Sequence, residues 1–241
     1  MALSTKPKAG SKPEDYNEPF GAYIGWQLVV TASAGMVFST TWTVLRLWTR
    51  QHISRALGPD DFLILAAWIS ATTLSIGDIV QCRYGTGTHL WELELEDFGV
   101  FLQLQMVVGN FYGAALAFAK ISILFFYLRV FEKPSFRILV YLTGGFVGCY
   151  ATAGVLVVVF SCNPVAASWD VSLAALPTTV CVNRPAAYLA QAAFNITSDV
   201  FVILLPLYEI WKLQMRLRQR LTLMAIFGVG FAFVASAQSD D

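Results

Sequence analysis

Long apolar runs separated by short polar segments dominate the hydrophobic pattern of the chain. A helix needs about 20 mostly apolar residues to cross a hydrocarbon core about 30 Å thick. The chain has six such windows, which predict spans at residues 23–47, 62–80, 98–127, 138–160, 186–211 and 221–237. A backbone in lipid must satisfy its own hydrogen bonds, and the alternating pattern of a β-barrel is absent. The pattern therefore predicts an all-α polytopic transmembrane helix bundle.

Composition indicates that lipid is the solvent for most of the chain. Hydrophobic residues make up 56% of the 241 residues, charged residues make up 13%, and the mean hydropathy is +0.60. These values are too apolar for a soluble domain. We expect one membrane domain at residues 23–238, a disordered extracellular tail at 1–22 and a short end at 239–241. The expected partner is the lipid bilayer, and no nucleic-acid partner is expected.

Basic residues gather in the loops after the first, third and fifth predicted spans. They are Arg46, Arg50, Arg55, Arg129, Lys133, Arg137, Lys212, Arg216, Arg218 and Arg220. The first loop on the other side is acidic, with Glu92, Glu94, Glu96 and Asp97. Because cationic loops mark the cytoplasmic side, we predict an extracellular N-terminus in a multi-pass protein of the plasma membrane. The basic loops are then a candidate surface for a cytoplasmic signalling partner.

The cysteine positions agree with that orientation. Cys162 and Cys181 bracket the second outer loop, Cys82 opens the first outer loop, and Cys149 lies within the fourth span. Disulfides persist outside the cell and in the secretory lumen, so we expect one bond among the three loop cysteines. The pairing of Cys162 with Cys181 is favoured, and four free thiols are the alternative.

Lys120 places a charge inside the longest apolar run. If Asp97 and Arg129 end the third span, Lys120 lies about 10 Å from its centre toward the cytoplasm. The amine can then extend along its stem to the lipid headgroups. Small residues near its face instead favour an amine that points into the bundle, because they let a neighbouring helix approach. These small residues are Gly109, Gly113 and Ala117.

The fifth span carries a polar stripe at Gln191, Asn195 and Asp199, followed by Pro206 as a predicted kink. Asp199 lies near the bilayer centre, and an intramembrane carboxyl marks either a functional site or a structural polar network. We expect a ligand that enters from outside between the third and fifth spans to meet five polar residues. They are Gln103, Asn110, Gln191, Asn195 and Asp199.

The preferred partner of Lys120 follows from depth along the membrane normal. Asp199 is about 9 Å shallower than Lys120, so a direct ion pair needs an extended lysine or a tilted helix. Glu209 lies nearer the inner surface, as do the two acids at the start of the second span. We therefore predict that Lys120 ties the helices together through Glu209, Asp60 or Asp61, with Asp199 as the less reachable choice.

Asp60 and Asp61 follow Pro59 at the cytoplasmic start of the second span. Proline suits the first helical turn, and acids there interact favourably with the helix dipole, which is a purely structural explanation. The alternative is an ion lock from Asp60 or Asp61 to Arg129 or to another basic-loop residue.

Several segments in the same order resemble the fungal rhodopsin-domain integral membrane proteins, a family that includes receptor-like proteins of plant-pathogenic fungi. The segments are LGPDDFLILAAW, RYGTGTHLWEL, AKISILFFYLRVF, CNPVAASWD and NITSDVFVILLPLYEIWKLQMRLRQRLTLMAIFGVGF. By this resemblance, signature positions are occupied by Asp60, Asp61, Tyr84, Gly85, Gly87, Lys120, Arg129, Cys162, Trp169, Cys181, Asn195, Asp199 and Pro206. The resemblance implies a seven-helix fold with an extracellular N-terminus and a sensing role. This sequence supplies six of the seven spans.

Three functional hypotheses follow. The first is a receptor-like protein that senses an extracellular small-molecule or surface ligand without photochemistry, because Lys120 is in the wrong helix for a retinal Schiff base. The second is a transporter or a membrane protein associated with a biosynthetic pathway, and the third is an inactive truncated product. Enzymatic activity, cofactors and metals are not expected, since the only histidines are His52 and His89 and no catalytic motif is present.

Overall fold

The computed structural model describes residues 25–54, 58–87 and 95–212. Its long helices are α1 (Gly25–Thr49), α2 (Pro59–Gln81), α3 (Leu95–Val130), α4 (Pro134–Val159) and α6 (Arg184–Lys212). All five are long and apolar enough to cross a membrane. The predicted all-α polytopic bundle is confirmed, and the first five predicted spans fall on these helices. The tail at 1–22, the sixth span at 221–237 and the end at 239–241 lie outside the described residues.

Short elements complete the described chain. The π-helix η1 (Arg50–Ser54) extends α1, and the 3-10 helix η2 (Cys82–Tyr84) follows α2. Between α4 and α6 lie β1 (Cys162–Asn163), the 3-10 helix η3 (Val165–Ser168), α5 (Val171–Ala174) and β2 (Val180–Cys181). Gly85 ends η2 with a φ of 119°, a left-handed conformation that suits glycine.

Local sequence explains where several helices begin. Pro59 and Pro134 occupy the first turns of α2 and α4, where a missing backbone N–H costs no helical hydrogen bond. Asp170 caps α5 by accepting bonds from the Ser172 hydroxyl and from the backbone N–H groups of Ser172 and Leu173. These bonds stabilise the carboxylate and hold the pKa of Asp170 below its usual value.

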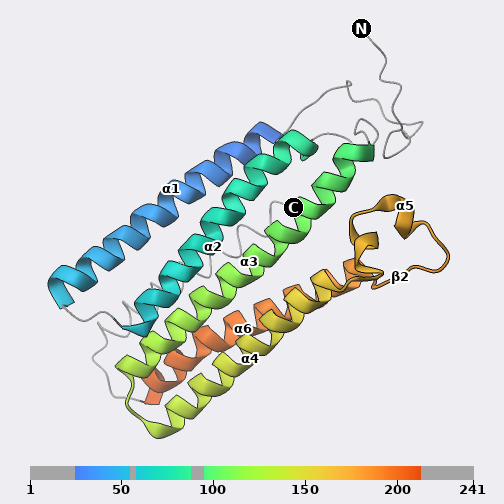
Figure 1. The fold of residues 1–241 in the computed structure, drawn as a ribbon. Helices are drawn as coiled ribbons and strands as arrows, with labels where there is room; N and C mark the ends of the chain where they lie inside the picture. Colours follow the sequence, from blue (N-terminus) through green and yellow to red (C-terminus); the bar gives the residue numbers. More distant parts are fainter. Residues whose placement is uncertain (1–24, 55–57, 88–94, 213–241) are drawn as a thin grey trace.

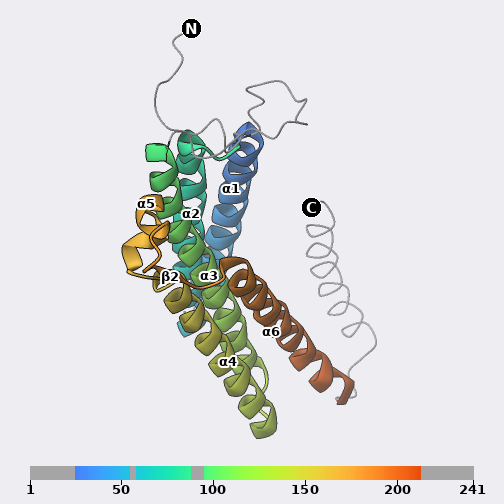
Figure 2. The ribbon, with the colours of Figure 1, turned by 90° about the vertical axis from the view of Figure 1, so that its right-hand side faces the viewer.

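Helices that follow one another in the sequence pack side by side, with α2 lying between α1 and α3 (Figure 1). On the other side of α3 lie α4 and α6, and α6 diverges from α4 toward the end that holds the α3–α4 connection (Figure 2). α2 and α3 pack along much of their lengths, whereas α3 and α6 meet over a short stretch. The links between α3 and α6 therefore decide how the two parts of the bundle are joined.

The two ends of the bundle differ in chemistry. The C-terminus of α1, the start of α2, the end of α3 and the start of α4 lie at one end of the bundle (Figure 1). The basic residues at these element ends are Arg46, Arg50, Arg129 and Lys133. This end also holds the main buried apolar cluster between α3, α4 and α6. The cluster comprises Leu124, Tyr127, Phe136, Val140, Val202 and Leu205. The same end thus combines the buried apolar cluster with basic side chains.

The opposite end carries the connection between α4 and α6, which is closed by a disulfide. Cys162 and Cys181 pair across the antiparallel strands β1 and β2, so the favoured pairing is confirmed. Cys82 and Cys149 are free. Arg184 at the start of α6 donates a hydrogen bond of 2.8 Å to the Ser168 carbonyl, which holds the loop against the helix.

Candidate functional site

A cavity of about 680 Å³ lies between α2, α3, α4 and α6. Its apolar wall includes Leu74, Val108, Leu116, Val155, Val158 and Ile196. Its polar wall comprises Gln105, Asn110, Tyr112, Tyr150, Tyr188, Gln191, Asn195 and Asp199. A volume of this size and a mostly apolar wall with a few placed polar groups are typical of small-molecule sites.

Glycines bring the walls of the cavity together. A Cβ added to Gly154 of α4 would lie 2.9 Å from the Gln191 amide nitrogen, and one added to Gly113 of α3 would lie 3.6 Å from it. Gln191 of α6 therefore packs directly on the backbones of two other helices. A Cβ added to Gly109 would meet nothing within 4 Å, although Gly109 also lines the cavity. The Gly109 position thus faces open space.

Lys120 forms a polar network at the α6 side of the cavity. Its Nζ lies 2.6 Å from Asn195 Oδ1, 2.7 Å from Ser198 Oγ and 3.0 Å from Asp199 Oδ1. It also donates to the Asn195 carbonyl at 3.0 Å, and the Tyr150 hydroxyl lies 3.4 Å away. The Lys120 amine therefore points into the bundle, where its charge is met by acceptors from α4 and α6.

The preferred partners Glu209, Asp60 and Asp61 are wrong, because the ionic partner of Lys120 is Asp199, which the sequence indicated as the less reachable choice. A comparison of depths along helix axes assumes upright helices and uses backbone positions alone. In the structure α6 is inclined to α4 (Figure 2). The long Lys120 side chain brings its Nζ to 3.0 Å from Asp199 Oδ1. Residues that differ in depth along two helix axes can still meet when a long side chain joins them.

The two members of the ion pair differ in exposure. The Lys120 side chain is 7% exposed, whereas the Asp199 side chain is 44% exposed and lines the cavity. An ion pair in a poorly solvated site is favourable only when further hydrogen bonds satisfy its charges, and Asn195 and Ser198 supply them for the lysine. The carboxylate is therefore the charged group that a molecule in the cavity would meet.

Four of the five predicted ligand-contacting residues line the cavity: Asn110, Gln191, Asn195 and Asp199. Gln103 is exposed and is not among the lining residues. Gln105 lines the cavity instead, and it accepts a hydrogen bond of 3.0 Å from Gln81 of α2. The sequence carried a signal for Gln105, because it lies four residues before Gly109 and therefore on the same face of α3.

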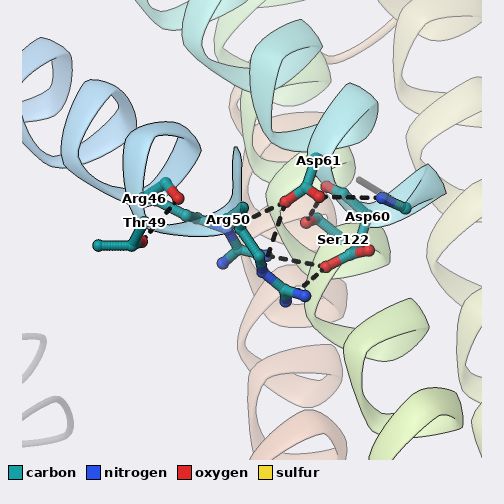
Figure 3. A network of polar contacts seen from close by, with 7 residues as sticks. Arg46, Thr49, Arg50, Asp60, Asp61 and Ser122 are labelled. Carbon is teal, nitrogen blue, oxygen red and sulfur yellow. Dashed lines mark hydrogen bonds and ion pairs between the residues drawn. The ribbon is translucent and has the colours of Figure 1, made fainter. Parts of the chain in front are cut away.

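A second polar cluster lies at the basic end, where α1 and η1 meet α2 (Figure 3). Asp60 Oδ2 lies 3.2 Å from Arg46 Nη2 and 2.9 Å from Arg50 Nη2. Asp61 accepts a hydrogen bond from the Gly58 N–H at 3.0 Å, and both guanidinium Nε atoms lie 3.8 Å from its other oxygen. Both carboxylates are buried. The partners of the acids are thus Arg46 in the last turn of α1 and Arg50 in η1.

Ser122 links this cluster to α3 by donating a bond of 2.8 Å to the Asp60 carbonyl. Arg129, the predicted alternative partner of the acids, is exposed at the end of α3. Glu209 is buried and pairs with Lys133 at 2.6 Å, and Pro206 is buried within α6.

Among the described residues, no group of three or more His, Cys, Asp or Glu side chains could hold a metal ion.

Curated relatives are fungal membrane and gene-cluster proteins. The chain is 26% identical over 215 residues to the polyenoic acids biosynthesis gene cluster protein Ba17b of Metarhizium anisopliae, covering 88% of this chain and 58% of the relative. It is 28% identical over 151 residues to a SAT4 family membrane protein of Emericella nidulans, covering 61% and 38% of the two chains. It is 25% identical over 201 residues to the receptor GIN3 of Arthrobotrys oligospora, covering 80% and 46%.

These matches span about half the length of the curated relatives, and no solved structure matches the chain. The family model described as the fungal rhodopsin domain matches residues 45–238, which include α2, α3, α4, α6 and every polar residue of the cavity. The chain therefore belongs to the fungal rhodopsin domain family of multi-pass membrane proteins.

Proposed function

We propose that this protein is a receptor-like membrane protein that binds a small molecule in the cavity between α2, α3, α4 and α6. One observation carries the proposal: a cavity of about 680 Å³ combines an apolar wall with a half-exposed carboxylate at Asp199. A relative that carries the name receptor GIN3 supports the same class of function. Binding and recognition need no catalytic group, and the lining residues present none in a catalytic arrangement.

We further propose that the end with the disulfide faces the outside and the basic end faces the cytoplasm. Disulfides persist in oxidising compartments, and Lys and Arg mark cytoplasmic loops. An epitope inserted at Pro177 should be labelled on intact cells, whereas one inserted at Glu132 should be labelled only after permeabilisation. The reverse labelling pattern would reject this orientation. The basic end would then be the surface for a signalling partner.

The binding proposal is tested by filling the cavity without disturbing the protein around it. The variant Gly109→Leu places a side chain in open space that the structure assigns to the cavity. Wild-type chain in nanodiscs is screened by thermal unfolding against a library of small molecules. A ligand at one hundred times its Kd stabilises the folded state by about 2.7 kcal/mol, which raises Tm measurably. We expect stabilising compounds to lose their effect on Gly109→Leu.

The matched control is Gly145→Leu. Gly145 also lies in a helix with nothing within 4 Å of an added Cβ, but it is exposed and does not line the cavity. Both variants gain the same side chain and lose one helical glycine, so their effects on helix propensity match. If every stabilising compound acts equally on Gly109→Leu and on Gly145→Leu, the cavity is not the binding site.

Transport is the second candidate function. The charge pair of Lys120 and Asp199 lies within the membrane-spanning helices, and intramembrane ionisable residues often mark substrate or proton pathways. The relative named for a polyenoic acids biosynthesis gene cluster supports a pathway-associated role. Uptake of a stabilising compound into proteoliposomes would favour transport, whereas stabilisation without uptake would favour the receptor.

A further inference from the structure

We infer that Gln191 selects the ligand of this cavity by pairing with a planar ligand group in which a hydrogen-bond donor lies beside an acceptor. Primary amides and lactams carry such a group. This inference rests on the proposed binding function and adds the residue that recognises the ligand and the chemical class of the ligand. It follows from how the Gln191 carboxamide is packed and from the hydrogen bonds that it leaves open.

The Gln191 carboxamide lies flat against α4. A Cβ added to Gly154 would lie 2.9 Å from Nε2, 3.0 Å from Cδ and 3.0 Å from Oε1 of Gln191. Because a point almost equally distant from these three atoms lies above the plane that contains them, one face of the carboxamide covers Gly154. The Gln191 nitrogen also lies 3.6 Å from a Cβ added to Gly113 of α3. Two glycines therefore hold the carboxamide in place between α3 and α4.

The hydrogen-bonding capacity of this carboxamide is unused. Gln191 is partly buried, yet neither its nitrogen nor its oxygen has a hydrogen-bond partner among the described residues, and both atoms remain accessible. The other three carboxamides of the cavity each already use one polar atom in a hydrogen bond within the protein, and they are those of Gln105, Asn110 and Asn195. Gln191 is thus the lining carboxamide that can offer both its donor and its acceptor to a ligand.

Two tyrosine hydroxyls also line the cavity, but a ligand does not enclose them. Tyr112 and Tyr188 are 52% and 51% exposed, so much of each side chain lies outside the cavity. An apolar ligand beside the partly buried Gln191 would instead remove water from its nitrogen and its oxygen. A polar group that loses water without gaining a partner is costly, and here both a donor and an acceptor would be left.

A ligand amide removes the cost at both atoms of Gln191. The ligand N–H donates to Oε1, and the ligand carbonyl accepts from Nε2, so the two planar groups pair edge to edge. The apolar remainder of the ligand then packs against the wall that continues toward Asp199. This wall includes Leu116, Val155 and Ile196. A mostly apolar molecule with one amide or lactam group fits this arrangement.

Three biphenyl probes of nearly the same shape test the ligand group. Biphenyl-4-carboxamide offers a donor beside an acceptor, 4-acetylbiphenyl offers the acceptor alone, and 4-isopropenylbiphenyl offers neither. Each probe is titrated by NMR against the full chain in nanodiscs, with its concentration referred to the lipid phase because the probes partition differently. The signal that remains in Gly109→Leu is subtracted as binding outside the cavity. We expect biphenyl-4-carboxamide to bind about tenfold more tightly than either of the other probes.

Two variants assign this preference to Gln191. Gln191→Met keeps the length of the side chain and removes its carboxamide, so the preference for biphenyl-4-carboxamide should disappear. Its control is Gln103→Met, because Gln103 is exposed and does not line the cavity. Gly154→Ala should displace the Gln191 carboxamide and weaken the preference. Its control is Gly148→Ala, because a Cβ added to Gly148 on the same helix meets nothing within 4 Å.

The results separate a failure of this inference from a failure of the binding function. Equal binding of the carboxamide and acetyl probes to the wild-type chain would overturn the inference and leave the binding function intact. A full preference that persists in Gln191→Met or in Gly154→Ala would do the same. If Gly109→Leu removes no binding of any of the three probes, both the inference and the binding function are overturned.

Discussion

Two buried charges among the described residues, Lys120 and Asp60, are each held by several contacts. Lys120 reaches acceptors on Asn195, Ser198 and Asp199, and Asp60 accepts from two arginines. The small residues beside Lys120 correctly indicated that its amine points into the bundle. Its partner could not be predicted, because helix tilt and the reach of a flexible side chain are tertiary properties. The pairing of Asp60 with Arg46 and Arg50 likewise depends on how α1 meets α2.

The cluster at Asp60 gives a prediction for a single residue. In Asp60→Asn the side chain keeps its size but loses the charge that Arg46 and Arg50 share. Asp60 is 3% exposed while both arginines are partly exposed, so water can rescue part of the loss. We expect the free energy of unfolding in detergent to fall by about 2 to 3 kcal/mol. An equal effect of Glu132→Gln, at an exposed acid, would show that the cluster contributes no special stability.

At the scale of elements, hydrophobic periodicity predicted the five described long helices well. The predicted span 98–127 became α3 (Leu95–Val130), and the predicted span 186–211 became α6 (Arg184–Lys212). The added ends include charged residues that lower the local hydropathy, namely Glu96, Asp97, Arg129, Arg184 and Lys212. The π-helix η1 and the two-residue strands β1 and β2 gave no pattern in the sequence, since such short elements depend on tertiary contacts.

The disulfide gives a prediction for the connection between α4 and α6. Cys162 and Cys181 are 19 residues apart, and closing a loop of that size contributes about 3 kcal/mol in the chain-entropy model. The double variant Cys162→Ser with Cys181→Ser should therefore lose about 3 kcal/mol of stability in non-reducing conditions. Cys149→Ser, at an exposed free cysteine, is the control. Unchanged stability of the double variant would show that the loop is ordered without the bond.

At the scale of the whole molecule, the cavity lies between α2, α3, α4 and α6, where α6 meets α3 over only a short stretch. Sequence periodicity placed Asn110, Gln191, Asn195 and Asp199 on faces that could meet. Sequence periodicity could not predict the cavity itself, because the volume of the cavity depends on the relative tilt of four helices. The pair of Lys120 and Asp199 is the main polar link between α3 and α6, so it ties the two parts of the bundle together.

The most direct test of this account is a double-mutant cycle on Lys120 and Asp199. Unfolding free energies are measured in lipid for Lys120→Met, for Asp199→Leu and for the combined variant. We predict a coupling free energy of about 2 kcal/mol between the two side chains. The combined variant should lose less stability than the two single variants lose together, because each single change leaves a charge without its partner. Losses that add to within about 0.5 kcal/mol would show that the two side chains do not interact in the folded protein, and would contradict the account.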